Sequence, residues 1–410
     1  MRELLMRTFT RLFCLLLIGA LAATAVRATA VRAEDALPLG IVKEKPSSGR
    51  FVETKQGFMV PYRDKVPGSE VVFEMVPVPG GVVRVGSPES EDGRSESEGP
   101  VFEVEVPPFW IGKYEVTWQE YKEFMGLHEL FLNFKISGER YVKSSNFTDA
   151  LNELDAITVP TKLYEPTFTF EKGEDPRLPA VTMTQYAARQ YTKWLSLCNG
   201  RFYRLPTEAE WEHACHAGAK TPYSFGADAK ELDTYAWHAG NSEESPHLVG
   251  TKKPNAWGVY DMHGNAAEWV LDMMLEDGYQ KFGGKRVSRD EAIVWPVKQD
   301  PRVVKGGHWA STAAECRVAA RLGSDTESWK GSDPNIPLSP WWFTDDPARG
   351  VGMRLVRALE EPDRKTREAH WKEVEEDFVF DIEARLQEGR GVIGIVDPKL
   401  PAEIVKHKGE

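Results

Sequence analysis

The stretch Asn255–Trp269, NAWGVYDMHGNAAEW, concentrates the residues of this chain that could do chemistry. Its glycines permit tight turns with positive φ, and its Asn and Asp side chains can hydrogen-bond the nearby backbone. Carboxylates such as Asp261 and Glu268 can also ligate hard cations. The composition therefore predicts a structured loop, which either holds a site or only fixes a shape.

Cysteine and histidine supply the other candidate chemistry. The chain has four cysteines, Cys14, Cys198, Cys215 and Cys316. Cys14 falls in an N-terminal apolar run, so an exported and processed chain would keep three, which most simply form one disulfide and leave one thiol. His213 and His216 stand three residues apart, as two metal ligands could, but no third ligand is in view and we expect surface histidines.

The first 33 residues have the pattern of a secretory signal peptide. Arg2, Arg7 and Arg11 give a positive start, and the apolar run Leu12–Val26 is shorter than a comfortable membrane span. Small residues at 28–33 offer two cleavage sites. An uncleaved anchor is the alternative, which the short run disfavours, so we expect an exported protein, periplasmic or extracellular.

The composition is typical of a globular protein with much irregular structure. Its 410 residues can form one large domain or two. Thirteen Trp beside 34 Gly and 27 Pro favour loops that large rings can bury. The formal net charge of −12 disfavours nucleic acid and anionic membranes as partners.

Local signals predict the elements that position these residues. The segment Val71–Ser87 alternates apolar residues around Pro79-Gly80-Gly81, which is typical of a β-hairpin. The segment Val101–Thr117 predicts one or two strands. Three threonines fit helix N-caps, namely Thr117 before a helix over 118–125, Thr184 before one over 185–197, and Thr207 before one that starts at 208.

Four parts follow from these patterns. After the signal peptide at 1–33, we expect an extended lead-in at 34–70, one domain at 71–358 with a variable insertion at 128–177, and a charged C-terminal helix and polar tail at 359–410. The insertion contains a glycosylation sequon, Asn146-Phe147-Thr148. The C-terminal helix is predicted from the three-to-four spacing of Trp371, Val374, Phe378, Ile382 and Leu386.

Several segments, in this order, resemble the formylglycine-generating enzyme family, also known as the sulfatase-modifying-factor domain. They include RLPTEAEW at 204–211, GVYDMHGN at 258–265, GGHW and RVAAR within 306–321, and RGVGMRLVRA at 349–358. The resemblance covers about residues 71–358. It implies a single α/β domain with much irregular structure, distantly related to C-type lectins, in a family whose members are mostly exported.

The family's best-known activity oxidises a sulfatase cysteine to formylglycine with O₂ and copper(I), and it needs two cysteine thiolates, because soft copper(I) prefers sulfur. In active members both cysteines lie between the Gly-Gly pair and the RxAAR segment. Here the interval His308–Cys316 has one cysteine. Counting forward from Gly307 puts Ser311 and Cys316 at the two positions, whereas counting back from Arg317 puts neither cysteine in this chain. Both counts predict that the copper pair is missing, and His308 stands where the family commonly has Ser.

The resemblance also bears on the cysteines. A family disulfide would join Cys215 to Cys316 and leave Cys198 without a partner. The alternative is that Cys316 is a half-preserved catalytic thiol.

A calcium site is implied as well. The carboxylates of Asp261 and Glu268 and the carbonyls of Gly264 and Ala266 match a family calcium site, and oxygen ligands at this spacing suit Ca²⁺. The alternative is a metal-free turn. The family often has an aromatic residue where this chain has Ala267.

These observations favour an exported protein that binds a ligand or partner, such as a sulfatase or another exported protein or peptide. The binding surface is predicted as a Trp-rich cleft near His308, Trp309, Trp341 and Trp342. The first alternative is an oxidase acting on sulfatase cysteine, with an altered copper site built from His308 and Cys316. The second is a structural envelope protein whose C-terminal helix docks on a partner. Calcium is the expected cofactor, and copper is not expected.

Overall fold

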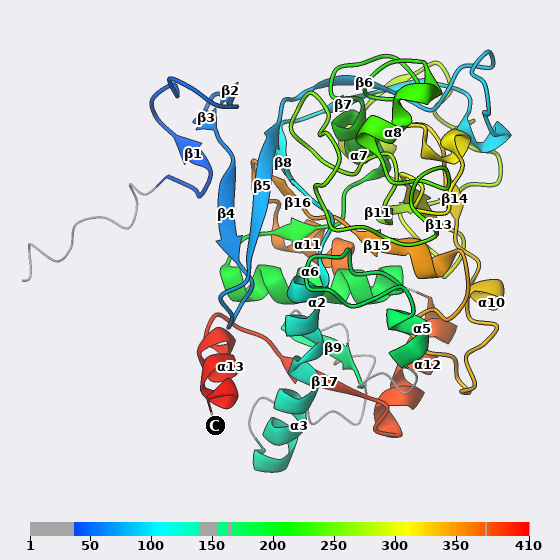
Figure 1. The fold of residues 1–410 in the computed structure, drawn as a ribbon. Coiled ribbons are helices and arrows are strands. Elements are labelled where there is room, and N and C mark those ends of the chain that lie inside the picture. The colour runs from blue at the N-terminus through cyan, green and yellow to red at the C-terminus, as the bar shows by residue number, and fades with distance from the viewer. Residues whose placement is uncertain (1–36, 139–154, 162–165, 374, 410) are drawn as a thin grey trace, which may run out of the picture.

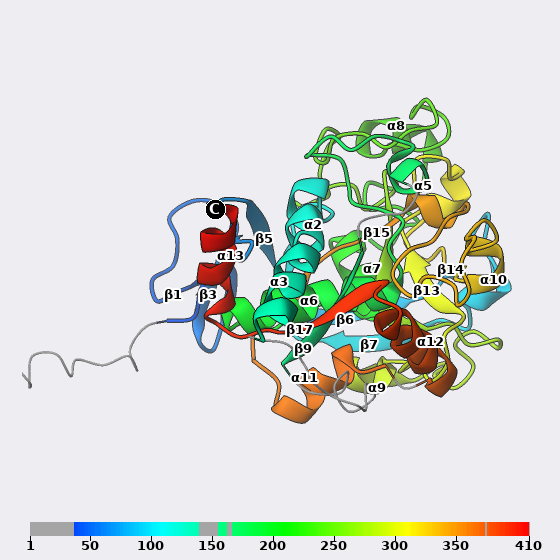
Figure 2. The same cartoon turned by 90° about the horizontal axis from the view of Figure 1, so that it is seen from below.

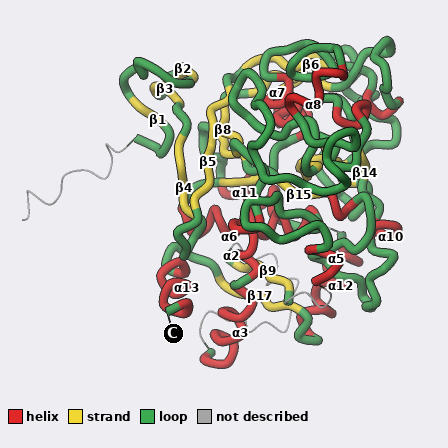
Figure 3. Tube along the Cα trace, viewed as in Figure 1, coloured by secondary structure: helices red, strands yellow, loops and turns green. Residues whose placement is uncertain are grey.

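The computed structural model describes residues 37–138, 155–161, 166–373 and 375–409 (Figure 1). The expected signal peptide, the sequon Asn146-Phe147-Thr148 and Val374 lie outside these ranges. Strands and helices are short, and loops make up much of the body (Figure 3). This mixed α/β architecture with much irregular structure confirms the predicted fold class. None of the helices in the described ranges is both long and apolar enough to cross a membrane.

A five-stranded antiparallel sheet organises one side of the molecule. Its order is β10–β16–β8–β5–β4, with β4 at Tyr62–Lys65, β5 at Val72–Val78, β8 at Phe109–Gly112, β10 at Tyr203–Arg204 and β16 at Val356–Ala358. The long helix α6, Gln185–Asn199, contacts β10. As predicted, α6 begins after Thr184, whose side chain accepts a hydrogen bond from Ala187 N, and it ends at Gly200 in the left-handed conformation.

Two further sheets form the other side. One has the order β14–β13–β11–β15, with β11 at Ala267–Met273, β13 at Arg302–Lys305, β14 at Leu322–Gly323 and β15 at Val351–Met353. The other has the order β12–β7–β6, with β6 at Gly81–Val85, β7 at Phe102–Val106 and β12 at Arg286–Ser288. A small outer sheet contains β1 at Ile41–Val42, β2 at Val52–Thr54 and β3 at Gly57–Met59.

The other helices described before residue 359 are shorter. They are α2 Trp118–Met125, α3 Leu127–Ser137, α5 Pro166–Phe170, α7 Glu208–His216, α8 Leu232–Tyr235, α9 Arg289–Ala292 and α10 Thr326–Trp329. Thr117 and Thr207 form capping boxes with Glu120 and Glu210, so the predicted starts of α2 and α7 are confirmed.

The predicted hairpin between β5 and β6 is wrong. β5 pairs with β4 and β8, whereas β6 pairs with β7 in another sheet. Pro79 and Gly80 carry the chain from one sheet to the next, and the ring of His213 hydrogen-bonds Pro79 O at 2.8 Å at this crossing. Alternation therefore identified two strands but could not identify their partners.

The predicted extended lead-in at 34–70 is not separate from the domain. β4 lies within it and pairs with β5 from Tyr62↔Met75 to Lys65↔Val72. Met59 has no exposed surface. The ordered body thus begins well before Val71, because the buried side chains of this segment complete the five-stranded sheet.

The C-terminal part is not one helix followed by a polar tail. It forms α11 Arg364–Trp371, α12 Glu376–Gln387, β17 Gly391–Ile395 and α13 Leu400–Lys408. β17 pairs antiparallel with β9, Ala156–Pro160, which belongs to the expected insertion. Figure 2 shows these elements along the underside of the molecule, and α13 contacts α3. The periodic residues Phe378, Ile382 and Leu386 are buried in the main hydrophobic core.

Candidate functional site

Four of the motif segments meet at the four-stranded sheet. The loop Asn255–Ala266 leads into β11, where Glu268 lies opposite Lys305 of β13 and beside Gly352 of β15. Gly306 and Gly307 follow β13 directly. Helix α7 contacts both β11 and β13. Segments far apart in the sequence are therefore joined through β11.

A cavity of about 210 Å³ opens beside the end of β13, and we name it the His308 pocket. It is lined by Ser95, Glu98, Ala267, Gly307, His308, Ser311, Glu315, Arg317, Arg321 and Pro347, among others. Ala267 is part of the wall. The family often has an aromatic residue at this position, so the small side chain of Ala267 leaves space in the pocket.

His308 and Ser311 form one edge of the His308 pocket. His308 N donates to Ser311 Oγ at 3.0 Å, and Ala310 N donates to His308 Nδ1 at 3.2 Å. Burial lowers the pKa of His308 to about 4, so its imidazole is neutral near pH 7. A Cβ at Gly350 would lie 2.6 Å from the ring of His308, so this glycine allows the ring to pack against the backbone.

Cys316 does not line the His308 pocket. It ends a short 3₁₀ helix, Ala313–Cys316, and its side chain is fully buried. A Cβ at Gly307 would lie 2.8 Å from its Sγ, so the thiol packs beneath Gly307. Burial raises the pKa of this thiol far above its ordinary value, which disfavours the thiolate that copper(I) needs.

The predicted disulfide between Cys215 and Cys316 is wrong. Both residues are buried and carry free thiols. His263 contacts both cysteines. Its ring nitrogens lie 3.7 and 3.9 Å from Cys215 Sγ, and its Nδ1 lies 2.9 Å from Cys316 O. The imidazole therefore occupies space between the two cysteines. Cys198 lies elsewhere, with its Sγ 3.9 Å from Asp397 O.

A buried arginine supports another wall of the His308 pocket. Arg317 donates to both carboxylate oxygens of Glu98, at 2.9 and 2.8 Å, and its Nη1 also donates to Glu91. Burial alone would raise the pKa of Glu98, but hydrogen bonds from Arg317, Ser87 and Ser95 outweigh it and hold the pKa below its ordinary value. Among the described residues, no partner is present for the buried Nε of Arg317.

The predicted Trp-rich cleft is wrong. Trp309, Trp341 and Trp342 are 3%, 1% and 7% exposed and belong to the main core. Trp341 Nε1 donates to Thr158 Oγ1 at 3.1 Å, and Trp342 packs edge-on against Tyr121. Aromatic content therefore indicated burial of irregular backbone rather than a binding surface.

The predicted calcium residues lie in a second region, next to Trp211. Glu268 accepts from Arg354 Nε at 2.9 Å and Nη2 at 2.6 Å, and from Trp211 Nε1 at 2.8 Å. Both of its oxygens are thus engaged by protein donors, so Glu268 does not fit the role of a calcium ligand. Gly264 has φ +156°, and a Cβ there would lie 2.2 Å from Trp237 O, so the turn requires glycine.

Asp261 does fit a cation. Its Oδ2 accepts from Gly250 N at 2.7 Å, while no partner for its buried Oδ1 is present among the described residues. Glu115, which precedes α2, is similar: its Oε1 accepts from Asn265 Nδ2 and Ala266 N at 3.1 Å each, and no described residue donates to its Oε2. Burial, followed by the charge of Asp261, raises the pKa of Glu115, and burial raises that of Asp261.

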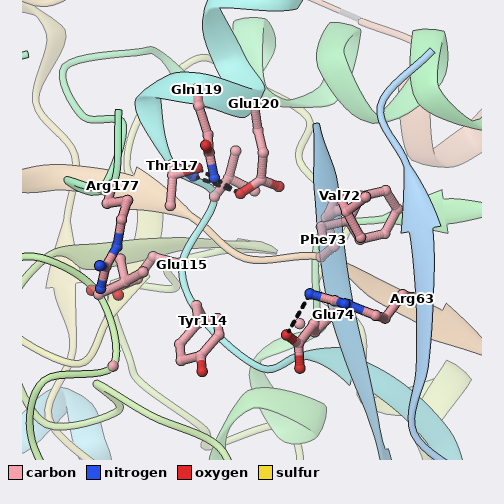
Figure 4. A pocket seen from close by; sticks show the side chains of 15 residues that line it. Arg63, Val72, Phe73, Glu74, Tyr114, Glu115, Thr117, Gln119, Glu120 and Arg177 are labelled. Carbon is pink, nitrogen blue, oxygen red and sulfur yellow. Dashed lines mark hydrogen bonds and ion pairs between the residues drawn. The ribbon is translucent and has the colours of Figure 1, made fainter. Parts of the chain in front are cut away.

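A larger cavity of about 350 Å³ leads to Glu115, and we name it the Glu115 pocket (Figure 4). Figure 4 shows Glu120 and Thr117 on one side and the ion pair of Arg63 with Glu74 on another. Glu120 Oε1 accepts from Thr117 Oγ1 at 2.7 Å and from Thr117 N at 3.1 Å. Burial raises the pKa of Glu120 to about 7.

His213 is not a surface histidine, and His216 is half-buried. His213 is 8% exposed and hydrogen-bonds Pro79 O, and burial lowers the pKa of His216 to about 4. Within the described ranges, no three side chains of His, Cys, Asp or Glu gather in a way that could hold a metal. Sequence reasoning missed Glu115, Arg354, Glu98 and Arg317, although Arg354 and Arg317 lie in the matched segments.

Comparison with known proteins decides the family. Residues 63–332 match the model of the sulfatase-modifying factor enzyme 1-like domain. The chain belongs to this family. As the sequence predicts, it is a formylglycine-generating-enzyme-like member in which one cysteine, not two, lies between Gly307 and Arg317.

Relatives of this family vary in what their names state. The inactive C-alpha-formylglycine-generating enzyme 2 of Bos taurus is 28% identical over 287 residues, which cover 64% of this chain and 86% of the relative. The formylglycine-generating enzyme of Thermomonospora curvata is 25% identical, covering 63% and 91%. The solved structure of PvdO from Pseudomonas aeruginosa aligns with 72% of this chain and 100% of its own, at 26% identity and a TM-score of 0.49.

Proposed function

We propose that this protein is an exported binding protein that holds a ligand or partner peptide in the His308 pocket and does not perform copper-dependent cysteine oxidation. One observation carries the proposal: the pocket offers the hydroxyl of Ser311, while the thiol of Cys316 is buried outside the lining. The lining of this pocket does not provide the two thiolates that would hold copper(I). The name of the Bos taurus relative, which calls that protein inactive, is consistent with this proposal.

The chemistry of the His308 pocket favours a ligand that accepts hydrogen bonds, such as a peptide carbonyl or carboxylate. Arg317 Nε is a buried donor for which the described residues provide no acceptor. Ser311 Oγ accepts from His308 N, so its own hydrogen can point to a ligand. An exported protein or peptide, a sulfatase among them, is the partner class that we propose.

The two alternatives have less support. An oxidase using His308 and Cys316 would need a thiolate at a buried position where burial raises the pKa. An envelope protein docking through its C-terminal helix would need a free apolar face, whereas Phe378, Ile382 and Leu386 of α12 are buried against the domain.

The decisive experiment uses residues 34–410 loaded with copper(I) and a cysteine-containing sulfatase peptide. We expect no aldehyde by mass spectrometry, and peptide binding by calorimetry in the absence of copper. Ala267→Trp should fill the His308 pocket and abolish binding, while Ser332→Ala, at an exposed position, should not change it. Aldehyde formation would overturn the proposal, and so would unchanged binding by a folded Ala267→Trp variant.

Export has its own test. We expect the protein recovered from the periplasm or medium to begin after residue 30 or 33, as N-terminal sequencing can determine. Recovery of the full-length chain in the cytoplasm would contradict export.

A further inference from the structure

A third cavity, of about 200 Å³, lies between β6 and the end of α7, and we name it the Trp257 pocket. Its walls come from β6, which is at the edge of its sheet, from the two histidines of α7, from the loop 218–222 that follows this helix, and from Trp257. The described residues that line it are all different from those of the His308 pocket and the Glu115 pocket. It is therefore a separate place where a ligand could bind.

One part of this lining is apolar. Val82 of β6 is 45% exposed, and Pro88 and Pro222 also border the cavity. The ring of Trp257 is half-buried and packs edge-on against the ring of His213, with the two centroids 4.9 Å apart. Apolar side chains that border a cavity are stabilised when the apolar part of a ligand covers them.

The other part of the lining carries free positive charge. Arg84 and Lys220 are exposed, and neither side chain forms an ion pair with another residue of the described ranges. Glu103, which lies opposite Arg84 in the sheet, pairs with a different arginine. The carboxylate of the lining, Glu91, accepts from Arg317. The Trp257 pocket therefore has uncompensated positive charge in a chain of formal net charge −12, which favours an anion.

The histidines of α7 add hydrogen-bonding capacity but no charge. Burial lowers the pKa of His213, and it lowers that of His216 to about 4, so both rings are neutral near pH 7. His213 Nε2 donates to Pro79 O. The described residues supply no partner for the buried Nδ1 of His216. The charge of the Trp257 pocket thus comes from Arg84 and Lys220.

We propose that the Trp257 pocket binds a carboxylate joined to a small apolar group, such as a phenyl ring. The carboxylate pairs with Arg84 and Lys220, since a planar carboxylate suits the forked guanidinium of an arginine. The apolar group covers Val82 and Trp257, and the volume of about 200 Å³ limits its size. This site does not depend on the function proposed for the His308 pocket.

Calorimetry at pH 7 and constant ionic strength tests this proposal, with phenylacetate as the probe and protein of residues 34–410. Wild type should bind the probe saturably, and it should bind the uncharged phenylacetamide at least about tenfold more weakly. The double variant Arg84→Gln/Lys220→Gln should also bind phenylacetate at least about tenfold more weakly. It should keep the Tm of wild type, because both side chains are exposed and without ion pairs among the described residues.

Arg286→Gln is the matched control. Arg286 is another exposed arginine of the same sheet, on β12, and does not line the pocket, so this variant should have the affinity of wild type. Wild-type affinity in Arg84→Gln/Lys220→Gln would overturn the proposal, and so would equal affinity for phenylacetamide. Loss of phenylacetate binding in Ala267→Trp alone would place the probe in the His308 pocket and would also overturn it.

The peptide Gly-Gly-Phe identifies the source of the carboxylate. Its free C-terminus presents the same carboxylate next to a phenyl ring. If this peptide binds as tightly as phenylacetate, the Trp257 pocket takes peptide C-termini, and if it binds more weakly, the pocket takes small organic acids.

Discussion

Two buried charge clusters lie next to Trp211, and they are built differently. In one, which we name the Lys305 network, Lys305 and Arg321 face Glu208 and Glu212, so two cations meet two carboxylates. In the other, which we name the acidic cluster, one cation, Arg354, meets the three carboxylates of Glu115, Asp261 and Glu268. Trp211 Nε1 donates to Glu268 of the acidic cluster, and the Lys305 ammonium of the Lys305 network lies 5.8 Å from the Trp211 ring centre.

The contrast shows what each cluster is suited to do. A balanced network satisfies its own charges and joins helix α7 to β13, which is a structural role. An unbalanced cluster needs something from solution, either protons or a cation. A buried cluster whose charges do not balance therefore indicates a binding site more reliably than the presence of buried charges by itself.

The largest effect should come from removing the one cation of the acidic cluster. Arg354→Met leaves three buried carboxylates without a counter-ion and should cost about 4–5 kcal/mol of unfolding free energy. Urea unfolding measures this loss. A loss below about 1 kcal/mol would show that the excess charge is already neutralised, which would remove the contrast between the clusters.

In the Lys305 network, Lys305→Met should cost about 3 kcal/mol, because Glu212 is fully buried while Glu208 keeps Arg321. The double variant Lys305→Met/Glu212→Gln should recover part of this loss. A double-mutant cycle with no recovery would show that the network is not a charge pair but a packing contact.

A smaller effect concerns pH. The pKa of Glu120 is raised from 4.5 to about 7 by burial, so its folded value lies above its unfolded one. Its contribution to stability is present below pH 4.5 and is lost as the pH rises through 7. The free energy of unfolding of Glu120→Gln should therefore increase relative to that of wild type as the pH rises, by up to about 3 kcal/mol at pH 8. Parallel stability curves from pH 5 to 8 would contradict this.

The smallest effect should come from an exposed pair. Arg286 and Glu103 lie 2.6 Å apart with side chains 60% and 40% exposed. Arg286→Gln should change the unfolding free energy by less than about 0.5 kcal/mol, since water screens such pairs. A loss as large as that expected for Lys305→Met would show that burial does not determine how much an ion pair stabilises this protein.

Local features were predictable from the sequence, and partners were not. Thr117, Thr184 and Thr207 specified three helix starts, because a cap acts within one turn. Pro79-Gly80-Gly81 suggested a hairpin, but pairing depends on distant strands and the chain crosses between sheets there. The C-terminal periodicity identified α12, whereas β17 needs β9, a partner from another part of the chain.

The candidate sites divide in the same way. The motif segments predicted that Asp261 and Glu268 lie near each other and that the copper pair is missing. They did not indicate that Arg354 donates to Glu268. The type of an acceptor residue does not indicate which distant donor will contact it in the fold. Glu115 was missed because its role depends on three segments meeting at β11.

The pairing of β17 with β9 has a consequence for synthesis. β9 emerges early from the ribosome, but its partner Ile395–Gly391 emerges near the end, so the buried edge of β9 stays open throughout elongation. Such an edge invites pairing with other chains. A chain that stops before β17 would keep that edge open permanently, so premature termination should give aggregation instead of a shorter working protein.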